Sequence, residues 1–273
     1  MADQKYYRIG DFAKKLGVTP DFLKYCEKKG LITSSQQENG YRYYDFSQSA
    51  TVLEYIKLKN QGFSAEEANR ILHTGSFREF AGHEFMLEHQ LAKQMNYLRA
   101  LRQYVSEIRE IQDFFTDPPR WNLRKLPAFY FFPHTIDDRL LEGDQYTERI
   151  PQWTSWMPVI CSASRLGWLE KAEQPVHWGF AAFESFARQQ ELDTSFPVEL
   201  VPARTNLEIF ITEDLSTASS RYIDHAMTLL TRLNLRQTQE AFSFTLAKLW
   251  DGEKRKGYSI LCIPAEERHE RRP

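Results

Sequence analysis

A basic and aromatic stretch, YRYY at residues 41–44, carries side chains well suited to contacting a phosphate backbone. In an extended strand Arg42 faces away from its tyrosine neighbours, so a guanidinium is presented beside aromatic rings. Asn39-Gly40 comes directly before this stretch, and both residues accept positive φ, which predicts a hairpin turn. The pattern is typical of a strand that holds phosphates next to stacked rings.

Two helices around a tight turn are predicted upstream of this strand. Apolar residues at helical spacing predict a first helix that begins near Ile9 and ends at Gly17. Thr19 is a good N-cap, and Pro20 suits the first position of a second helix over residues 21–29. Two helices joined by a short turn form the helix-turn-helix plan, in which the second helix enters the major groove of DNA.

These elements expose a set of side chains suited to DNA. Each signal alone is more often only a cap or a turn, but their joint order favours DNA binding. The predicted DNA-contacting residues are Lys15, Thr19, Asp21, Phe22, Lys24, Tyr25, Tyr41, Arg42 and Lys59.

Residues 6–73 resemble the winged-helix DNA-binding domain of the MerR family of transcription regulators. The family's Arg and second Tyr are replaced here by Lys24, which loses the bidentate fork of arginine, and by Cys26. The resemblance implies a DNA-binding domain over residues 1–75. The matching residues are Ile9-Gly10, Thr19-Pro20, Leu23-Lys24-Tyr25-Cys26-Glu27, Gly30-Leu31, Gly40-Tyr41-Arg42-Tyr43-Tyr44 and Gly62-Phe63-Ser64.

Composition sets the bounds of the interpretation. A chain of 273 residues suits two domains and a connector. Its net charge is −2, and residues 1–75 hold eleven Lys/Arg against nine Asp/Glu, so DNA affinity must depend on local placement and dimerisation. We expect a cytoplasmic protein without a membrane span or signal peptide. The three scattered cysteines fit a reducing compartment.

A connector is predicted over residues 76–120, with one long helix from about His83 to Phe115. Its apolar residues recur at steps of three, four and seven, which favours one helical face. We therefore expect an antiparallel coiled coil that forms a homodimer, as in the resembled family. A helix packed along its own second domain is the alternative. The stripe consists of Leu87, Leu91, Leu98, Leu101, Val105, Ile108 and Phe115.

The C-terminal part, residues 121–273, alternates predicted strands and helices, beginning with one strand over residues 123–134. Leu126-Pro127-Ala128 and Val201-Pro202-Ala203 occupy equivalent places in two β-α-β-β units, which indicates an internal duplication. The expected fold class is α+β: an N-terminal winged helix-turn-helix, a long dimerisation helix and a C-terminal duplicated β-α-β-β domain.

This duplicated module resembles the GyrI-like ligand-binding domain, which accompanies MerR-type winged helices in multidrug-sensing regulators. The resemblance implies a groove between the repeats, where aromatic walls bind planar lipophilic compounds. Ordinary core packing is the alternative for each candidate. The family often places an acid on the penultimate strand, and Glu240 at the strand's edge is nearest here. The predicted ligand-binding residues are Tyr146, Trp153, Trp178, Tyr222, Glu240, Phe244 and Tyr258.

Other chemistry is weakly supported. No Cys lies between residues 27 and 160, so a thiolate metal site is not expected, and no cofactor-binding fingerprint is present. The chain is predicted to be a non-enzymatic, ligand-responsive regulator that binds promoter DNA and activates by distorting it, with RNA polymerase nearby. A DNA-tethered small-molecule hydrolase, using Glu184 or Glu240, and a ligand-free repressor are the alternatives.

Overall fold

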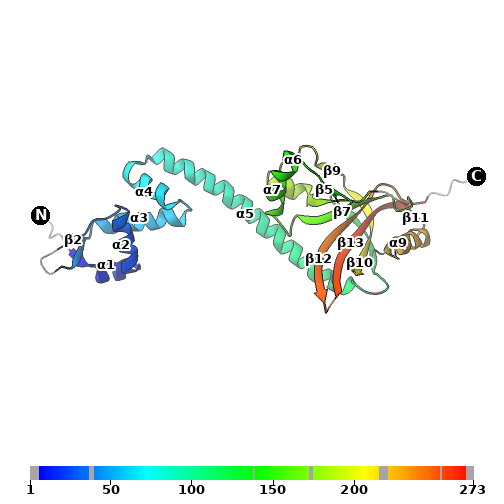
Figure 1. Ribbon diagram of the computed structural model, residues 1–273, viewed down its shortest axis with the longest axis horizontal. Coiled ribbons are helices and arrows are strands. Elements are labelled where there is room, and N and C mark those ends of the chain that lie inside the picture. The colour runs from blue at the N-terminus through cyan, green and yellow to red at the C-terminus, as the bar shows by residue number, and fades with distance from the viewer. Residues whose placement is uncertain are drawn as a thin grey trace, which may run out of the picture. The chain divides into compact units, whose positions relative to one another are not determined.

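The computed structural model describes residues 6–36, 40–137, 139–171, 175–214, 221–252 and 254–268. The chain divides into two compact units, Met1–Ala92 and Lys93–Pro273, which are described separately. Helices and strands are mixed along the chain (Figure 1). Asn39 of the predicted turn lies outside the described residues.

The first unit packs short helices on a three-stranded sheet of order β1-β3-β2. Its core includes Phe12, Leu23, Cys26 and Tyr44, all buried. The strands β2 and β3 form the wing beside the helices. The elements are β1 (Tyr6–Arg8), α1 (Ile9–Leu16), α2 (Pro20–Lys28), β2 (Ser35–Gln36), β3 (Arg42–Asp45), α3 (Gln48–Asn60) and α4 (Ala65–Thr74).

The helix ends of this unit follow the local signals of the sequence. Helix α1 ends at Gly17, whose φ of 69° is the left-handed conformation that glycine adopts without strain. The Thr19 hydroxyl accepts a hydrogen bond from the backbone N–H of Phe22 at 3.1 Å. Ser64 and Glu67 form a capping box at the start of α4. The predicted helix stop at Gly17 and N-cap at Thr19 are therefore confirmed.

Helix α5 (Phe77–Ile111) is the predicted long helix, followed by a short 3-10 turn, η1 (Gln112–Phe114). It begins at Phe77 rather than His83 because a second reciprocal cap precedes it. The Ser76 N–H donates to the Glu79 carboxylate at 3.0 Å, and the Glu79 N–H donates to the Ser76 hydroxyl at 3.3 Å. Every residue of α5 is described, and none of them is fully buried.

The second unit is built on a ten-stranded sheet. Along its main path the strand order is β4-β10-β13-β12-β7-β8-β5-β6, with β9 paired to β5 and β11 paired to β13. The elements are β4 (Trp121–Leu126), β5 (Phe129–Ile136), β6 (Arg139–Leu140), α6 (Asp144–Thr147), α7 (Arg149–Thr154), β7 (Cys161–Gly167), β8 (His177–Phe183), α8 (Glu184–Gln189), β9 (Glu199–Val201), β10 (Arg204–Asp214), α9 (Arg221–Arg232), β11 (Leu235–Gln237), β12 (Ala241–Asp251) and β13 (Lys254–Glu267).

The single strand predicted over residues 123–134 was wrong. The chain makes two strands there, β4 and β5, which separate at Pro127-Ala128 and pair with different neighbours. Strand β4 pairs with β10, whereas β5 pairs with β8 and β9. Proline has no N–H to donate to a ladder, so the break falls where hydrogen bonding cannot continue.

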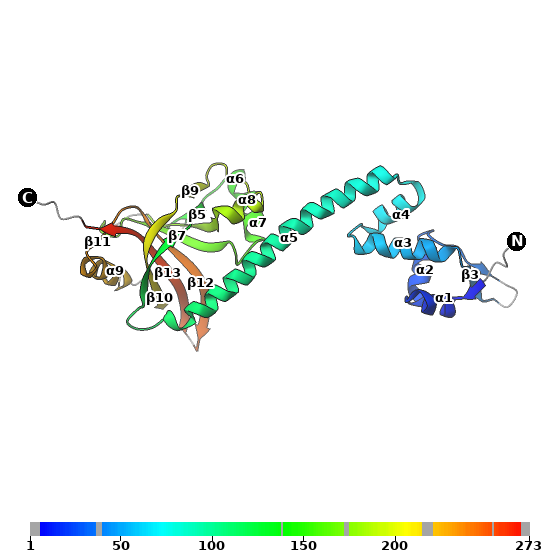
Figure 2. The ribbon, with the colours of Figure 1, turned by 180° about the vertical axis from the view of Figure 1, so that it is seen from behind.

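The two faces of the sheet differ in what covers them. On one face, Phe132 and Phe180 pack with α7 and α8, and Ile209 of β10 packs with α9. The register places Phe242 and Cys262 on the opposite face, because alternate residues of a strand point to opposite sides. We call this the Phe242 face. Figures 1 and 2 show α9 beside β10 and the end of α5 beside the strands.

The strands that come before β5 and β10 are exchanged. In the β4–β10 pair Leu126 lies opposite Arg204, and in the β9–β5 pair Val201 lies opposite Phe129. Each strand thus pairs with the main strand that follows the other Pro-Ala step. The two exchanged pairs have equivalent registers, because in each the residue before one Pro-Ala step lies opposite the residue after the other.

Candidate nucleic-acid interface and ligand cavities

The N-terminal end of α2 presents an exposed ion pair. The Lys24 Nζ lies 2.8 Å from the Asp21 Oδ1, with both side chains more than half exposed. The hydrogen bond from Lys24, with its charge, lowers the pKa of the Asp21 carboxyl. Asp21 therefore fixes the direction of the lysine at the helix start, while Thr19 remains exposed as the cap.

The predicted contacts Phe22 and Tyr25 lie partly within the unit. The Phe22 ring stacks on Tyr25 and approaches Tyr55 of α3, with centroids 6.4 and 6.2 Å apart. The hydroxyls of Tyr25 and Tyr55 are 3.2 Å apart. These rings pack α2 against α3, and both Phe22 and Tyr25 are partly buried. Cys26 is buried, and burial raises the pKa of its thiol to about 11.

The wing is tied to its neighbours by two arginines. Arg42 lies 3.5 Å from the Glu27 carboxylate of α2, which directs its guanidinium toward the second helix. Arg8 of β1 donates from Nε to the Tyr43 hydroxyl at 3.3 Å and lies 4.8 Å from the Tyr41 ring centroid. Sequence reasoning missed Arg8, because only the pairing of β1 with β3 brings it to the wing.

Two further predicted DNA contacts have local partners. The Lys15 Nζ lies 5.8 Å from the ring centroid of Tyr7. Lys59 donates to the Phe63 carbonyl at 2.8 Å and thereby closes the C-terminal turn of α3. Both residues are exposed, so their charges remain in solvent while their side chains stabilise local structure.

Five of the seven predicted ligand-binding residues line neither of the two cavities described below, and four of these five lie away from the Phe242 face. Trp153 is fully buried and Tyr146 nearly so, in the cluster around Phe132. The hydroxyl of Tyr222 on α9 donates to the Thr212 carbonyl. Trp178 is partly exposed beneath Lys248, whose Nζ is 5.6 Å from the indole centroid. The structure does not gather these four side chains around one cavity.

The other three predicted residues lie on the Phe242 face or at its end. Phe244 is buried in the cluster that defines this face. Tyr258 lines an apolar cavity, and Glu240 lines a separate charged cavity. The predicted set is thus divided among several sites.

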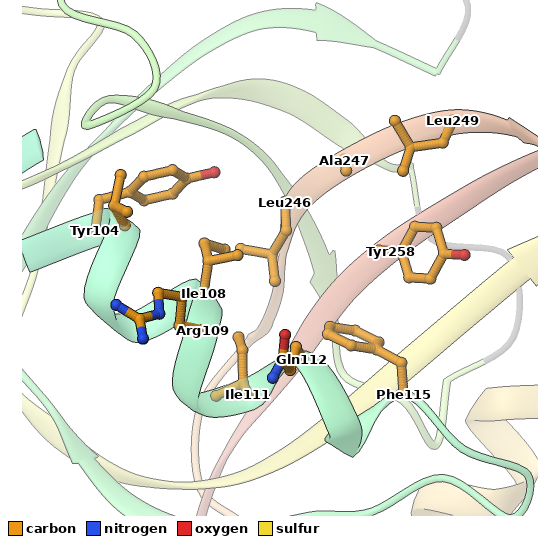
Figure 3. Close-up of a pocket in the computed structure, with 11 residues that line it drawn as sticks. Tyr104, Ile108, Arg109, Ile111, Gln112, Phe115, Leu246, Ala247, Leu249 and Tyr258 are labelled. Carbon is orange, nitrogen blue, oxygen red and sulfur yellow. The ribbon is translucent and has the colours of Figure 1, made fainter.

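The apolar cavity has a volume of about 470 Å³ and lies between the end of α5 and two strands. Figure 3 shows Tyr104 and Ile108 on the helix, Leu246 and Leu249 on β12, and Tyr258 on β13 around this space. The Phe115 ring meets Tyr258 edge-on, with centroids 5.4 Å apart. A β-bulge between Thr245 and Ala247 inserts Leu246, and bulges redirect side chains in this way.

The charges around the apolar cavity have one sign. Arg109 and Gln112 are its polar lining residues besides the two tyrosines, and no Asp or Glu is among the described lining residues. Arg109 is exposed and forms no ion pair within the described chain. The lining is therefore mainly apolar, with one exposed positive charge and no negative charge among its described residues.

The charged cavity has a volume of about 330 Å³ and lies where β9, β10 and the start of β12 meet. Its charged lining residues are Arg165, Glu199, Arg204 and Glu240. The guanidinium carbons of Arg165 and Arg204 lie 5.5 and 5.7 Å from the Phe131 and Phe242 ring centroids. The cavity therefore combines fixed charges with aromatic support at one end of the Phe242 face.

A buried carboxyl on the same face was missed by sequence reasoning. Glu208 lies within β10, opposite Cys262, and is 3% exposed. Burial raises the pKa of Glu208, and the charge of Arg124 and a hydrogen bond from Asn122 oppose that change. Alternation along β10 assigns Glu208 to this face, but its burial depends on packing that local sequence does not reveal.

The described residues contain neither a membrane-spanning helix nor a metal-binding cluster of side chains. Within those ranges no helix combines the length and apolarity needed to cross a membrane. The same part of the chain holds no group of three or more His, Cys, Asp or Glu side chains arranged to bind a metal ion.

Comparison with known proteins matches residues 7–74 to the MerR HTH family regulatory protein model. An uncharacterized HTH-type transcriptional regulator of Pseudomonas aeruginosa is 28% identical over 110 residues, which is 40% of this chain and 80% of that relative. The mercuric resistance operon regulatory protein of Bacillus cereus is 37% identical over 24% of this chain, and the match spans about half of that relative, 51%. The CueR regulator of Salmonella typhi is 26% identical over 38% of this chain and 73% of its own.

Among solved structures, the cryo-EM complex of EcmrR with DNA is 15% identical over 96% of this chain and 100% of that chain, with a TM-score of 0.38. The MerR family regulator HiNmlR bound to promoter DNA is 20% identical over 40% of this chain and 94% of that one, with a TM-score of 0.34. The named sequence relatives are transcription regulators and not enzymes. Residues 7–74 are therefore a MerR-type helix-turn-helix region, and the matches support a MerR-family transcription regulator.

Proposed function

We propose that this chain is a cytoplasmic, homodimeric regulator whose second unit senses a lipophilic small molecule in the apolar cavity. One observation carries the proposal: α5 itself forms a wall of that cavity, through Ile108 and its neighbours. A ligand there contacts the helix directly, so binding energy can bias the helix position. The helix-turn-helix region of residues 7–74 then supplies the DNA contact.

The proposal includes a GyrI-like origin for the second unit. Strands β5, β7 and β8 with α7 follow the same order as β10, β12 and β13 with α9. The sheet order β5-β8-β7 then mirrors β10-β13-β12, with β7 and β12 adjacent. The exchanged pairs at Phe129 and Arg204 support the same interpretation. A duplicated β-α-β-β module accounts for all these matches.

The ligand class follows from the cavity lining. Aromatic rings of Tyr104, Phe115 and Tyr258 favour a planar apolar body. The absence of acids among its described lining residues disfavours a lipophilic cation, and the exposed Arg109 favours an uncharged compound or a carboxylate. This chain would differ in that respect from the cation-binding members of the resembled family.

Homodimer formation is proposed from the exposed apolar residues of α5. Leu91, Met95, Leu98 and Val105 are each more than half exposed, although they are large and apolar. Their steps of four, three and seven match a heptad seam. Val105, although more than half exposed, lines the apolar cavity together with Ile108 and Phe115 of the predicted stripe. The exposed remainder is available to a second copy of the helix.

The dimer is proposed to act on double-stranded promoter DNA next to RNA polymerase. Ligand binding would change the distortion of the promoter, so that DNA shape is read as energy. Arg8, Lys24 and Arg42 supply exposed positive charge beside the wing and α2. Each residue would contact phosphates, while Tyr41 would stack beside the sugar-phosphate backbone.

The DNA-binding part is tested by Arg42→Ala, with Arg236→Ala in the second unit as the matched control. Loss of one phosphate contact should lower the slope of log affinity against log salt concentration by about 1, and it should weaken binding to all DNA sequences equally. Fluorescence anisotropy over a salt series measures this slope. An unchanged slope for the Arg42 variant would exclude the assigned contact.

The sensing part is tested with the full chain and a library of neutral, anionic and cationic lipophilic compounds. All six tryptophans lie within the second unit, so quenching of their fluorescence reports binding there. Neutral or carboxylate compounds should quench and should also change promoter affinity. Failure of every compound would overturn the sensing role, and chemical turnover of a bound compound would instead support an enzyme.

A further inference from the structure

The charged cavity holds two arginines in different electrostatic situations. Arg165 is paired, because its Nη1 lies 2.6 Å from the Glu199 carboxylate and its Nε lies 3.9 Å from the Glu240 carboxylate. Arg204 instead donates to the Gln239 side-chain oxygen and, at 3.3 Å, to the Glu240 backbone carbonyl. Within the described residues no carboxylate lies at ion-pair distance from Arg204.

The environment of Arg204 leaves part of its guanidinium unsatisfied. Its Nε is buried and has no hydrogen-bond partner among the described residues. Burial lowers the pKa of Arg204, and the charge of Glu240 opposes that change. A cation held by neutral oxygens on a ring face is stabilised when an anion approaches, because desolvation of the cation has already occurred.

The total charge of the cavity restricts the ligand further. Two guanidiniums and two carboxylates line it, and they balance. His177 of β8 lies opposite Arg165 of β7 in the strand register. Burial lowers the pKa of the His177 imidazole, and the charge of Arg165 lowers it further. His177 therefore adds no positive charge beside the cavity at neutral pH. A simple anion would be repelled by Glu199 and Glu240, which are both about half exposed. A simple cation would leave Arg204 without a counter-ion.

We propose that the charged cavity binds a small zwitterion, with its carboxylate on Arg204 and its ammonium beside Glu199 and Glu240. The body of the ligand lies along Phe242 and Trp168, which line the same space. This site is separate from the apolar cavity, whose lining shares no residue with it. It adds a second ligand class to the proposed sensing unit.

Isothermal titration calorimetry of the full-length chain with three matched probes tests the proposal. The probes are L-phenylalanine, L-phenylalaninamide, which lacks the carboxylate, and 3-phenylpropanoate, which lacks the ammonium. L-phenylalanine should bind at least about tenfold more tightly than either analogue, since each loses one charge-assisted contact. No binding by any probe at millimolar concentration, or equal binding by all three, overturns the proposal.

Two variants assign the contacts. Arg204→Gln should lower the affinity for L-phenylalanine at least about tenfold and leave the affinity for L-phenylalaninamide unchanged. Glu240→Gln should lower the affinity for L-phenylalaninamide and leave the affinity for 3-phenylpropanoate unchanged or higher. Arg188→Gln is the control, because Arg188 pairs with Glu184 on α8 outside the cavity. Circular dichroism checks folding, and Glu240→Gln alone decides the question if the Arg204 variant does not fold. Unchanged probe selectivity in Glu240→Gln contradicts the site.

Discussion

The apolar and charged cavities lie on one unit of the chain but have walls of different kinds. The apolar cavity takes part of its lining from α5, whereas the charged cavity is lined by strands and turns of the sheet unit alone. A ligand in the first touches the long helix, and a ligand in the second does not. We therefore expect that a ligand in the apolar cavity affects α5 by direct contact. A ligand in the charged cavity can affect α5 only through the sheet.

The largest effect is expected at the exposed face of α5. Leu98→Glu should weaken dimerisation by about 1,000-fold or more, because each copy loses burial of about 2 kcal/mol and gains a charge. Gln103→Glu on the same helix is the control. Analytical ultracentrifugation measures the change. Ligand binding in the apolar cavity should survive, since Leu98 is not among its lining residues; loss of ligand binding together with the dimer would contradict the separation of the two roles.

Filling the apolar cavity should have the next largest effect. Ala247→Trp places a ring among the lining residues and should weaken lipophilic ligands by about 100-fold, or about 2.7 kcal/mol. Ala247→Ser is the matched control that leaves the space open. Quenching and calorimetric titrations measure both ligand classes. L-phenylalanine binding should be unchanged, and a parallel loss of both ligands would show that the cavities are not independent.

A smaller effect is expected at the edge of the apolar cavity. Arg109→Gln should weaken a lipophilic carboxylate by about threefold to tenfold, since the exposed guanidinium is screened by solvent. A neutral ester of the same compound should bind with unchanged affinity. Competition titrations with the acid and ester measure the ratio. Equal losses for both compounds would remove the charge preference assigned to this cavity.

The smallest effect concerns the buried carboxyl on the Phe242 face. Because the pKa of Glu208 is raised in the folded chain from its ordinary 4.5, its contribution to stability is present below that value. The contribution is lost as pH rises through the higher folded value. Glu208→Gln should therefore unfold at higher denaturant than the parent at neutral pH and lose this pH dependence. Urea unfolding at acid and neutral pH measures it; an unchanged difference between the two proteins would contradict the assignment.

Local signals predicted the first unit well. The glycine at residue 17, the Thr19-Pro20 start and the Ser64 cap each depend on a few neighbouring residues, so their positions could be predicted without tertiary contacts. Helix α5 begins at Phe77 and not near His83, because the reciprocal cap of Ser76 and Glu79 lies upstream of the apolar stripe from which the helix was predicted. Pro127 marks the break that a continuous apolar run concealed.

The ligand cavities could be predicted only in part. Tyr258 and Glu240 were identified as candidates, but Trp153 packs into the core, which composition alone does not distinguish from a cavity wall. The lining role of Ile108 depends on how α5 meets β12, and the bulge at Leu246 depends on strand pairing. Contacts of this kind join segments that are distant in the sequence, so local sequence patterns do not predict them.

The exchanged strands make the second unit resistant to division. Strand β4 completes the part of the sheet that contains β10, and β9 completes the part that contains β5. Cleavage in the segment between α8 and β9 would leave each fragment with a strand belonging to the other. Two fragments expressed separately are therefore expected to complement each other, which makes this segment a suitable place to divide the protein into a two-part reporter of its own assembly.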